Sequence, residues 1–468
     1  MAAGDDTQKT TVNLAVCGLV VLAAIALLTL LYVNLPPNVQ TPYGVQRHAV
    51  TFFRLLWGYP TFELPPAIFR IFASAAILLF WGAYLFGLWI VSRLPADQDH
   101  TALLPIIFGC AIVFNVMLLF YFPPVLSGDV FHYAVQGRLY AIHGQNPYGV
   151  AADAVPDDPF WALSIWREGT TQYGPLWIQL SALCASLGNG GVLLTVFLFK
   201  LLSAVSNLVG AALVVVLTRR LKGGDGVVPL LFYAWNPILL IESSGSAHND
   251  AVMMTLALIG IFLLTQSRFV FGTVALLASA LIKYVTLLLL GMAAIHVLSR
   301  QSSRQLGLGL RLIVASAVMI VVVYAPFMSG LPDPMQVFSG MSASHNPMPN
   351  NAGYLLRQIT GFAAQAAGLD PASYVNLILN ILFVFFVVLL VPGLVTKEAG
   401  LADVMGTFGL ATLVYSFLIY GGSFPWYLVC PLVALAVAPP VQATVYLRLL
   451  AIGLGIGFMM HVTVLIPR

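Results

Sequence analysis

The polar segment 127–148 carries the first side chains that could do chemistry. Asp129 directly follows an apolar stretch, and a partly desolvated carboxylate there would be a stronger base than one in water. The residues after Asp129 have the spacing of a helix. On such a helix His132 and Gln136 would share a face with Asp129, whereas Arg138 would not share the face of Asp129 and His132. This arrangement favours general-base chemistry. The non-catalytic alternative is an aspartate that caps the start of a helix, beside a histidine exposed to solvent.

A second polar cluster, residues 242–250, lies between two apolar stretches. One of its serines, such as Ser246, can cap the helix that follows, and a helix N-terminus offers unpaired N–H groups and a positive dipole to an anion. His248, Asn249 and Asp250 would project near that end. The cluster is therefore a candidate anion site, with an ordinary capped polar loop as the alternative.

Lys283 interrupts an apolar stretch, residues 269–298, and Tyr284 follows it. Because a lysine at mid-depth in a bilayer costs several kcal/mol, we expect two short helices that meet at Lys283 near one membrane face. There its ammonium would be placed to receive a phosphate group. A lysine that only extends to the membrane surface is the alternative.

Two later segments add candidate binding residues. A long loop carries His345 and is followed by Arg357, and a short loop carries Trp426 and Tyr427. Aromatic rings such as these, and Tyr173 in the first polar loop, can stack on a sugar ring or form the aromatic belt at a membrane surface. The sequence leaves both interpretations open.

No metal motif of high specificity exists in the sequence, since it contains no CxxC, HExxH or Walker loop. Asp129, His132, His248 and Asp250 could jointly hold a divalent cation, Mg²⁺ or Mn²⁺, together with water. Oxygen-rich coordination has no strict spacing signature. The sequence therefore assigns no metal ligand and leaves a divalent cation open as a cofactor.

These residues must be positioned by a very apolar chain. Of 468 residues, 8% are charged and 60% are hydrophobic, and the mean hydropathy is +0.94, whereas soluble domains carry about 25% charged residues. This excludes a cytosolic enzyme, a disordered protein and a disulfide scaffold, and it predicts an all-α polytopic membrane protein in contact with lipid. The net charge of +3 without a basic tract argues against nucleic acid as a partner. The four cysteines are expected to pack without a disulfide.

A bilayer core about 30 Å thick needs roughly 20 apolar residues in a helix, so we expect about 13 spans in a single domain, residues 1–468. The first apolar stretch is expected to be a retained helix rather than a cleaved signal. Residues 174–188 are too short and too interrupted for a span and are expected to be re-entrant or interfacial. The expected continuous spans are 12–34, 67–92, 102–122, 190–218, 227–242, 248–266, 309–328, 373–395, 404–420, 424–438 and 442–464.

Basic residues concentrate in loops of one parity, with Arg219, Arg220 and Lys222 in one of them. The positive-inside rule then predicts that these loops and the N-terminus are cytoplasmic. The opposite face receives the polar clusters and two long loops, 123–189 and 329–372, which are expected to be folded and to cover a cavity. We therefore predict a multi-pass protein of the cell membrane whose active site is extracytoplasmic.

The expected site combines a desolvated acid, a lysine suited to phosphate and aromatic rings on one membrane face. Such a combination fits the transfer of a group from a lipid-linked phosphate to a hydroxyl. An ordered set of motifs also resembles bacterial polyprenol-phosphate-mannose-dependent α-1,6-mannosyltransferases, which belong to the GT-C class of integral-membrane glycosyltransferases. The motifs are GDVFHY at 128–133, QGR at 136–138, NPY at 146–148, YGPLW at 173–177, NP at 236–237, HNDA at 248–251, ALIK at 280–283 and PWY at 425–427.

This resemblance implies that Asp129 is the general base and that Lys283 and Arg357 bind the donor phosphate. One departure concerns the loop order. In many GT-C enzymes the catalytic acid lies in the first external loop, which here is 35–66 and has Glu63 as its only carboxylate. Either an extra helix pair precedes the shared core, which the motif around Asp129 favours, or Asp129 is not the base. Further expected site residues are His248 and Ser246 for the phosphate, and His132, Tyr133, Arg138, Tyr173, Asn249, Asp250, Tyr284, His345, Trp426 and Tyr427 for the substrates.

The expected function is transfer of a sugar, with mannose favoured, from a polyprenyl-phosphate donor to a hydroxyl of a glycan or glycolipid acceptor by inverting displacement. The main alternative is a transporter or lipid flippase. Such proteins usually have repeated halves with broken helices in matching positions. No such repeat is found in the sequence, and its polar residues gather on one membrane face.

Overall fold

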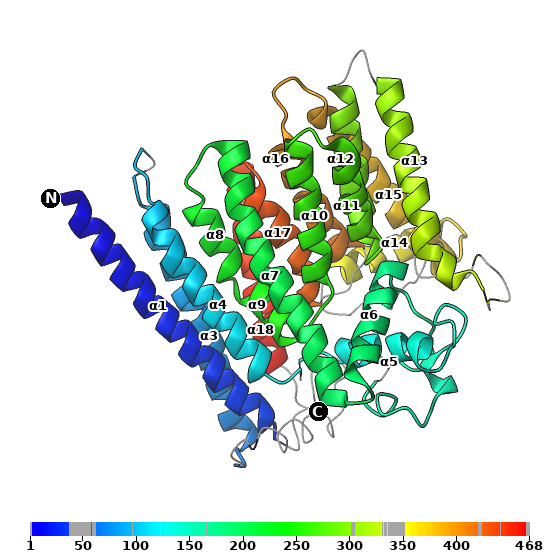
Figure 1. Ribbon diagram of the computed structural model, residues 1–468, viewed down its shortest axis with the longest axis horizontal. Coiled ribbons are helices and arrows are strands. Elements are labelled where there is room, and N and C mark those ends of the chain that lie inside the picture. Colours follow the sequence, from blue (N-terminus) through cyan, green and yellow to red (C-terminus); the bar gives the residue numbers. More distant parts are fainter. Residues whose placement is uncertain are drawn as a thin grey trace.

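The computed structural model describes residues 2–36, 58, 62–95, 97–124, 126–164, 166–300, 305–329, 331, 335, 352–419, 424–439 and 441–464, and within them it has helices and no strand. The all-α polytopic fold is thereby confirmed. The α-helices, labelled as in Figure 1, are α1 (Ala2–Val33), α3 (Pro66–Ser92), α4 (Leu104–Phe120), α5 (Asp129–Ala141), α6 (Pro175–Gly188), α7 (Val192–Lys222), α8 (Val227–Ala234), α9 (Pro237–Leu240), α10 (Asp250–Thr265), α11 (Phe269–Ala280), α12 (Leu287–Ser299), α13 (Gln305–Tyr324), α14 (Ala352–Ala366), α15 (Pro371–Leu394), α16 (Leu401–Val414), α17 (Val429–Val437) and α18 (Gln442–Val464).

Among the described residues, seven helices are long and apolar enough to cross a membrane, or eight if the bent pair α8 and α9 counts as one span. Six shorter apolar helices add to these. The predicted number of about 13 spans remains a prediction, because length and composition do not decide which of the short helices cross the membrane.

The expected span 227–242 is not one continuous helix. α8 ends at Ala234, and α9 begins at Pro237 after a bend of 53°. Proline cannot continue the hydrogen bonds of the preceding turn, and it disfavours the helical conformation of the residue before it. Asn236 is accordingly extended, and its side chain accepts hydrogen bonds from the first N–H groups of α9.

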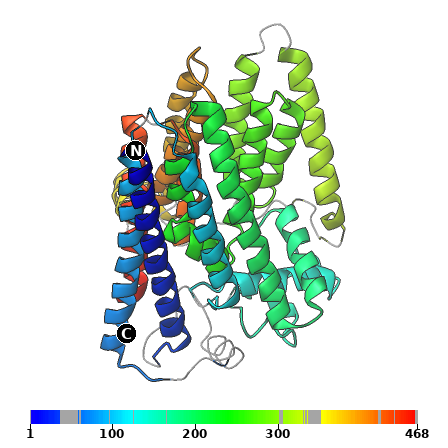
Figure 2. The same cartoon turned by 60° about the vertical axis from the view of Figure 1, so that its left-hand side comes forward.

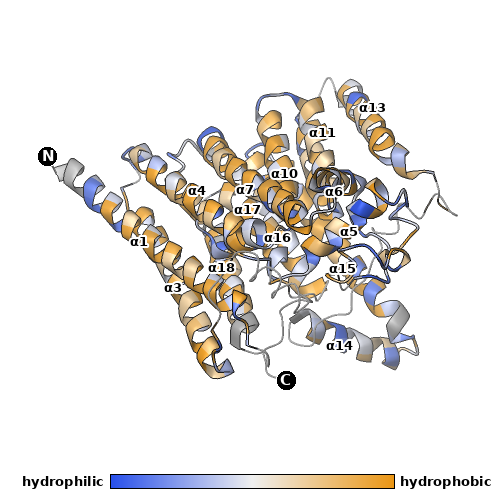
Figure 3. Ribbon diagram, turned by 60° about the horizontal axis from the view of Figure 1, so that its bottom comes forward, coloured by the Kyte–Doolittle hydropathy of each residue, from blue (hydrophilic) through white to orange (hydrophobic). Residues whose placement is uncertain are grey.

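The outward faces of α13 and α15 are strongly apolar. Leu306, Ile313 and Phe385 are exposed there, as expected for side chains in contact with lipid tails. Figure 3 shows hydrophobic residues along the long helices and more hydrophilic residues in α5. The bundle therefore has the surface of a membrane protein, with its polar groups collected in a few places.

Helices α5 and α6 lie together at one end of the bundle, as Figures 1 and 2 both show. The loops that join α7 to α8 and α15 to α16 lie at the opposite end (Figure 1). α5 packs closely on α6 because Gly137 has no side chain: a Cβ there would lie 2.3 Å from the carbonyl oxygen of Ser181.

The second long loop, 329–372, contains a helix that the sequence analysis did not predict. α14 is amphipathic, and Leu355, Ile359 and Phe362 form an exposed apolar row at helical spacing. The other side of α14 is attached to the bundle through Arg357, which donates to the carbonyl oxygen of Ile419 at 2.8 Å.

Candidate active site

Asp129 is the first residue of α5, and three hydrogen bonds fix where this helix begins. The ammonium of Lys200, from α7, donates to the carbonyl of Leu118 in the last turn of α4 at 2.6 Å and to that of Phe122, just after this helix. Ser127 then accepts a hydrogen bond from the backbone N–H of Asp129 at 3.2 Å. The segment between α4 and α5 is therefore held at both ends.

The Asp129 carboxylate is buried and has few partners. Tyr133 donates its hydroxyl to Oδ2 at 3.4 Å, and Nδ1 of His248 lies 3.6 Å from the same oxygen. Burial raises the pKa of Asp129 to about 6, partly offset by attraction to Lys283 and reinforced by the negative charge of Asp250. A carboxyl group with this pKa is ionised at neutral pH and is a stronger base than an exposed aspartate.

His248 sits between two carboxylates. Its Nε2 atom lies 3.2 Å from Oε2 of Glu242, and its Nδ1 atom faces Asp129. The ring is 1% exposed and stacks on Trp426 with 4.2 Å between centroids and 22° between planes. Burial and, next, the positive charge of Lys283 lower the pKa of His248 well below its usual range, so the imidazole is neutral.

The backbone that presents His248 is unusual. Residues Ile241–Gly245 form a π-helix, and Ala247 has a φ of 62°. A left-handed conformation costs a residue with a Cβ about 1–2 kcal/mol, and such outliers often occur at functional sites. The expected serine cap is wrong: the N-cap of α10 is Asn249, and no side chain caps that helix.

Lys283 lies where the structure breaks the apolar stretch, which confirms the two predicted short helices. α11 ends at Ala280, Lys283 itself is extended, and a 3₁₀ turn leads into α12. Its ammonium lies 2.9 and 3.1 Å from the two carboxylate oxygens of Asp250. The Lys283 side chain is 24% exposed and the Asp250 side chain 1%, so the lysine is partly open to solvent while its partner is buried.

The Lys283 turn is also joined to the start of α6 through the backbone. Gly174 donates its N–H to the carbonyl of Ile282 at 3.0 Å, and Leu176 donates to that of Leu281 at 3.0 Å. A Cβ on Gly174 would lie 2.1 Å from the Leu281 carbonyl oxygen. Glycine is therefore required for this close approach.

Aromatic rings surround the charged groups. Tyr133 makes edge-to-face contacts with Tyr173 and Trp177, with centroids 5.1 and 5.0 Å apart. On the other side the ammonium of Lys283 lies 5.2 Å from the ring centroid of Tyr427, a cation–π geometry. Tyr133, Tyr173, Trp426 and Tyr427 are thus all placed around Asp129, His248 and Lys283.

Several polar atoms of the predicted site residues have no hydrogen-bond partner among the described residues, although they are buried. They include Oγ of Ser246, both side-chain polar atoms of Asn249 and Nδ1 of His132. Buried polar groups are nearly always satisfied. These atoms are therefore unsatisfied in the described part of this structure.

The remaining predicted residues are placed differently. The guanidinium of Arg138 forms a buried ion pair with Asp158 at 2.7 Å, and the hydroxyl groups of Tyr284 and Tyr324 lie 3.2 Å apart. Arg357 binds the carbonyl oxygen of Ile419 and the side chain of Asn376. Glu63 is exposed and precedes α3. His345 lies outside the described residues.

The structure adds two residues to which the sequence analysis gave no role. Glu242 lies beside His248, with 3.2 Å between Oε2 and Nε2 but no hydrogen bond between them, and Lys200 holds the segment before Asp129. A signal for Lys200 was present, because it interrupts an apolar stretch just as Lys283 does. The contact between Glu242 and His248 depends on the π-helix, for which the sequence shows no clear pattern.

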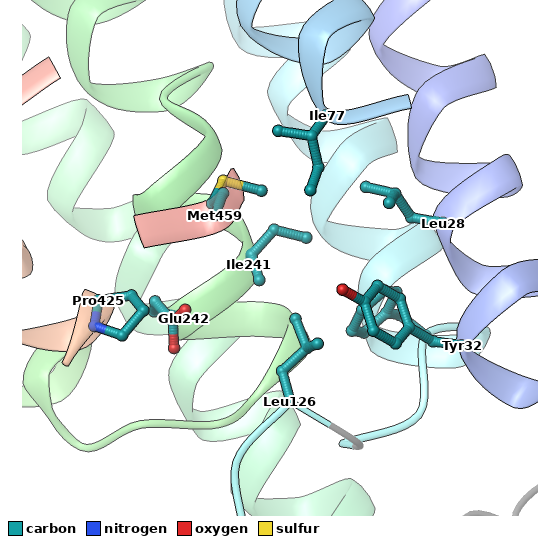
Figure 4. Close-up of a pocket in the computed structure, with 9 residues that line it drawn as sticks. Leu28, Tyr32, Ile77, Leu126, Ile241, Glu242, Pro425 and Met459 are labelled. Carbon is teal, nitrogen blue, oxygen red and sulfur yellow. The ribbon is translucent and has the colours of Figure 1, made fainter. Parts of the chain in front are cut away.

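Glu242 also contributes to the wall of an apolar pocket between the N-terminal helices and the site, shown in Figure 4. The side chains around it are otherwise almost entirely hydrocarbon. They come from α1, α3, the segment between α4 and α5, the π-helix, the segment before α17, and α18: Leu28, Tyr32, Ile77, Phe122, Leu126, Ile241, Pro425 and Met459.

Within the described residues, no group of three or more His, Cys, Asp or Glu side chains is arranged to hold a metal ion. We assign no residue of the cluster as a metal ligand.

Comparison with known proteins relates the same part of the chain to a family. Residues 69–299, which include Asp129, Glu242, His248, Asp250 and Lys283, match the family described as alpha-(1->6)-mannopyranosyltransferase, N-terminal domain. The resemblance predicted from the motifs is confirmed.

Individual relatives agree with this match. The chain is 31% identical over 166 residues to alpha-(1->6)-mannopyranosyltransferase A of Corynebacterium glutamicum, covering 35% of this chain and 33% of that protein. It is 32% identical over 164 residues to alpha-(1->6)-mannopyranosyltransferase A of Mycobacterium tuberculosis, covering 34% and 31%. The chain therefore matches about a third of the length of these curated relatives.

Proposed function

We propose that the protein is a glycosyltransferase that moves a mannosyl group from a polyprenyl-phosphate donor to a hydroxyl of a glycan or glycolipid acceptor. The reaction takes place at the extracytoplasmic face of the cell membrane and inverts the configuration at the anomeric carbon. The relatives are alpha-(1->6)-mannopyranosyltransferases by name, which favours mannose and this reaction class.

One observation carries the proposal. Asp129 and Lys283 come from segments far apart in the sequence, yet they lie in one cluster with His248 and Asp250. A base and a phosphate-binding cation in one site are the two groups that transfer from a lipid-linked phosphate needs. Lys283 has three N–H donors, so it can bind a phosphate oxygen while Asp250 holds it in place.

The reaction is a single displacement. The acceptor oxygen forms a bond to the anomeric carbon, Asp129 takes the acceptor proton, and the bond from that carbon to the phosphate oxygen breaks. The electron pair leaves with the polyprenyl phosphate, whose added charge is met by Lys283. General-base assistance contributes about 10²–10⁴-fold in typical enzymes, and charge stabilisation often contributes more.

The proposed orientation rests on the distribution of charge. Arg219 and Arg220 at the end of α7, and Lys397 between α15 and α16, lie at the end of the bundle opposite α5 (Figure 1). The positive-inside rule assigns such an end to the cytoplasm. The site then faces outward, where a lipid-linked donor keeps its tail among the helices and its phosphate at the membrane surface.

The direct test supplies purified protein in lipid nanodiscs with labelled polyprenyl-phosphate mannose and α-1,6-linked mannose oligosaccharides, with and without a chelator. We expect a product that is one mannose longer, with an α-linkage by mass spectrometry and NMR. Asp129→Asn should give no product, while the matched control Asp157→Asn, an exposed aspartate, should retain activity.

Three results bear on different parts of the proposal. Near-normal turnover of Asp129→Asn would remove Asp129 from the role of base. Retention of configuration would exclude a single displacement. Loss of activity with chelator, restored by Mg²⁺ or Mn²⁺, would add a divalent cation to the site.

A further inference from the structure

The mechanism above uses one carboxylate, but the structure places a second one behind it. Glu242 is 4% exposed and reaches His248 from the side opposite Asp129. The two ring nitrogens of His248 thus face two different carboxylates, at 3.6 Å to Oδ2 of Asp129 and 3.2 Å to Oε2 of Glu242. An imidazole in this position can accept a proton at one nitrogen and release one from the other.

We propose that Asp129, His248 and Glu242 form a proton relay that carries the acceptor proton away from the reacting oxygen to Glu242. This inference rests on the proposed function and names two further residues for it. His248 and Glu242 extend the path of the proton by one imidazole and one carboxylate.

The relay balances in protons and charge. Asp129 takes the proton of the acceptor hydroxyl and passes it to Nδ1 of His248, while the proton on Nε2 of His248 moves to Glu242. Asp129 is then ionised again, His248 is neutral with its proton on the other nitrogen, and Glu242 is a neutral acid. After the products leave, the proton returns by the same path and is lost to water at Asp129.

The surroundings favour this route over a charged histidine. His248 is 1% exposed and stacked on Trp426, and an imidazolium is costly in such a place. Glu242 borders the apolar pocket of Figure 4, where a desolvated carboxyl group holds a proton more tightly than one in water. The relay therefore starts from the ionised form of Glu242, whose share grows as the pH rises. The coordinated shift of two protons leaves no buried positive charge on the ring.

Neither contact is a closed hydrogen bond in the free protein, because both ring nitrogens of His248 and Oε2 of Glu242 have no hydrogen-bond partner among the described residues. The 3.6 Å contact to Asp129 is also longer than the roughly 2.7–3.2 Å of a good hydrogen bond to nitrogen. Catalytic hydrogen bonds are often long in free enzymes and shorten when the substrates bind. The other charged groups that act on this triad are Asp250 and Lys283, which form their own ion pair.

The relay is tested with Glu242→Gln, Glu242→Asp, His248→Phe and the double variant of His248→Phe with Glu242→Gln. Phenylalanine keeps the stacking on Trp426 but removes both nitrogens. Glu398→Gln, an exposed glutamate at the other end of the bundle, is the matched control. Initial rates are measured in nanodiscs from pH 5.5 to 8.5 with labelled donor, and thermal unfolding is measured for each variant.

We expect Glu242→Gln to lower kcat about 10–100-fold while the donor KM stays within about twofold. Glu242→Asp should recover part of the activity. The double variant should be no slower than His248→Phe, because members of one path are not additive. Wild-type kcat in Glu242→Gln, or losses that multiply in the double variant, would overturn the relay.

An infrared titration of the carboxyl C=O bands separates the relay from the proposed function. The relay couples the two carboxyl groups, so Glu242→Gln should shift the titration of the Asp129 band, and His248→Phe should reduce that shift. If wild type transfers no sugar, the proposed function fails while this measurement still decides the relay. An Asp129 band that titrates identically with and without Glu242 would overturn it.

Discussion

Asp129→Asn should abolish transfer and at the same time stabilise the folded protein at neutral pH. The Asp129 carboxylate is buried, and its pKa of about 6 exceeds the ordinary value of 3.8. The difference corresponds to about 3 kcal/mol between the two protonation states. This is an upper bound for the cost of holding an ionised carboxylate at this position.

The sign follows from proton linkage. Because the pKa is raised in the folded state, the native protein binds more protons than the unfolded chain between about pH 4 and 6, so its stability falls as the pH rises through that window. Above about pH 6 the cost is complete and constant. Asparagine removes the charge, keeps the shape and still accepts the hydrogen bond of Tyr133, so the variant avoids the cost.

The assay is thermal unfolding in nanodiscs at pH 4.5, 6 and 7.5, read by intrinsic fluorescence, for wild type, Asp129→Asn and the control Asp157→Asn. We expect Asp129→Asn to be more stable than wild type by up to about 3 kcal/mol at pH 7.5, with the difference shrinking toward pH 4.5. Transfer should fall about 10²–10⁴-fold. A variant that is less stable at pH 7.5, or a difference that does not change with pH, would refute the reasoning.

Three further substitutions test how the site is positioned. Gly174→Ala places a methyl group against the Leu281 carbonyl and should displace the Lys283 turn. We therefore expect the KM for the donor to rise at least about tenfold, and an unchanged KM would contradict the close approach. Lys200→Met removes the donor that holds the segment before Asp129, and kcat should fall about tenfold with the fold intact by thermal unfolding. Ala247→Gly relieves the backbone strain of the left-handed conformation at this position. The variant should retain activity and gain about 0.5–1 kcal/mol of stability, and a loss of stability would show that the strain is absent.

Features set by the cost of charge in a bilayer could be predicted from the sequence. The helix break at Lys283 was predicted because an uninterrupted helix would place an ammonium at mid-depth in the bilayer, and the structure has the break there. The helix from Asp129 was predicted from the spacing of its residues. The alternation of spans and loops also predicts that the polar clusters share one membrane face, and the structure brings Asp129, His248 and Lys283 into one site.

Features set by contacts between distant segments could not be predicted in this way. The structure pairs Arg138 with Asp158, and neither residue carries a sequence signal for the other; the expected substrate-binding role of Arg138 stays a prediction. The bend before Pro237 was foreseeable from the proline alone. The π-helix that aims Glu242 at His248 was not, because its geometry depends on packing against neighbouring helices.

The charges in the site lead to a final prediction about donor binding. The cluster has three carboxylates, on Asp129, Glu242 and Asp250, against the single ammonium of Lys283. A phosphodiester brings another negative charge, which raises the pKa of nearby carboxyl groups further. Donor binding should therefore take up protons, and donor affinity should fall as the pH rises from 6 to 8.

Turnover should respond in the opposite direction, because Asp129 must be ionised to act as a base. Calorimetric titration of donor in two buffers of different ionisation enthalpy measures the proton uptake directly, and Asp129→Asn should reduce it. Donor binding that releases protons, or that is independent of pH between 6 and 8, would mean that the phosphate does not sit beside these carboxylates. The opposed trends then give kcat/KM a maximum where the donor still binds and Asp129 has already lost its proton.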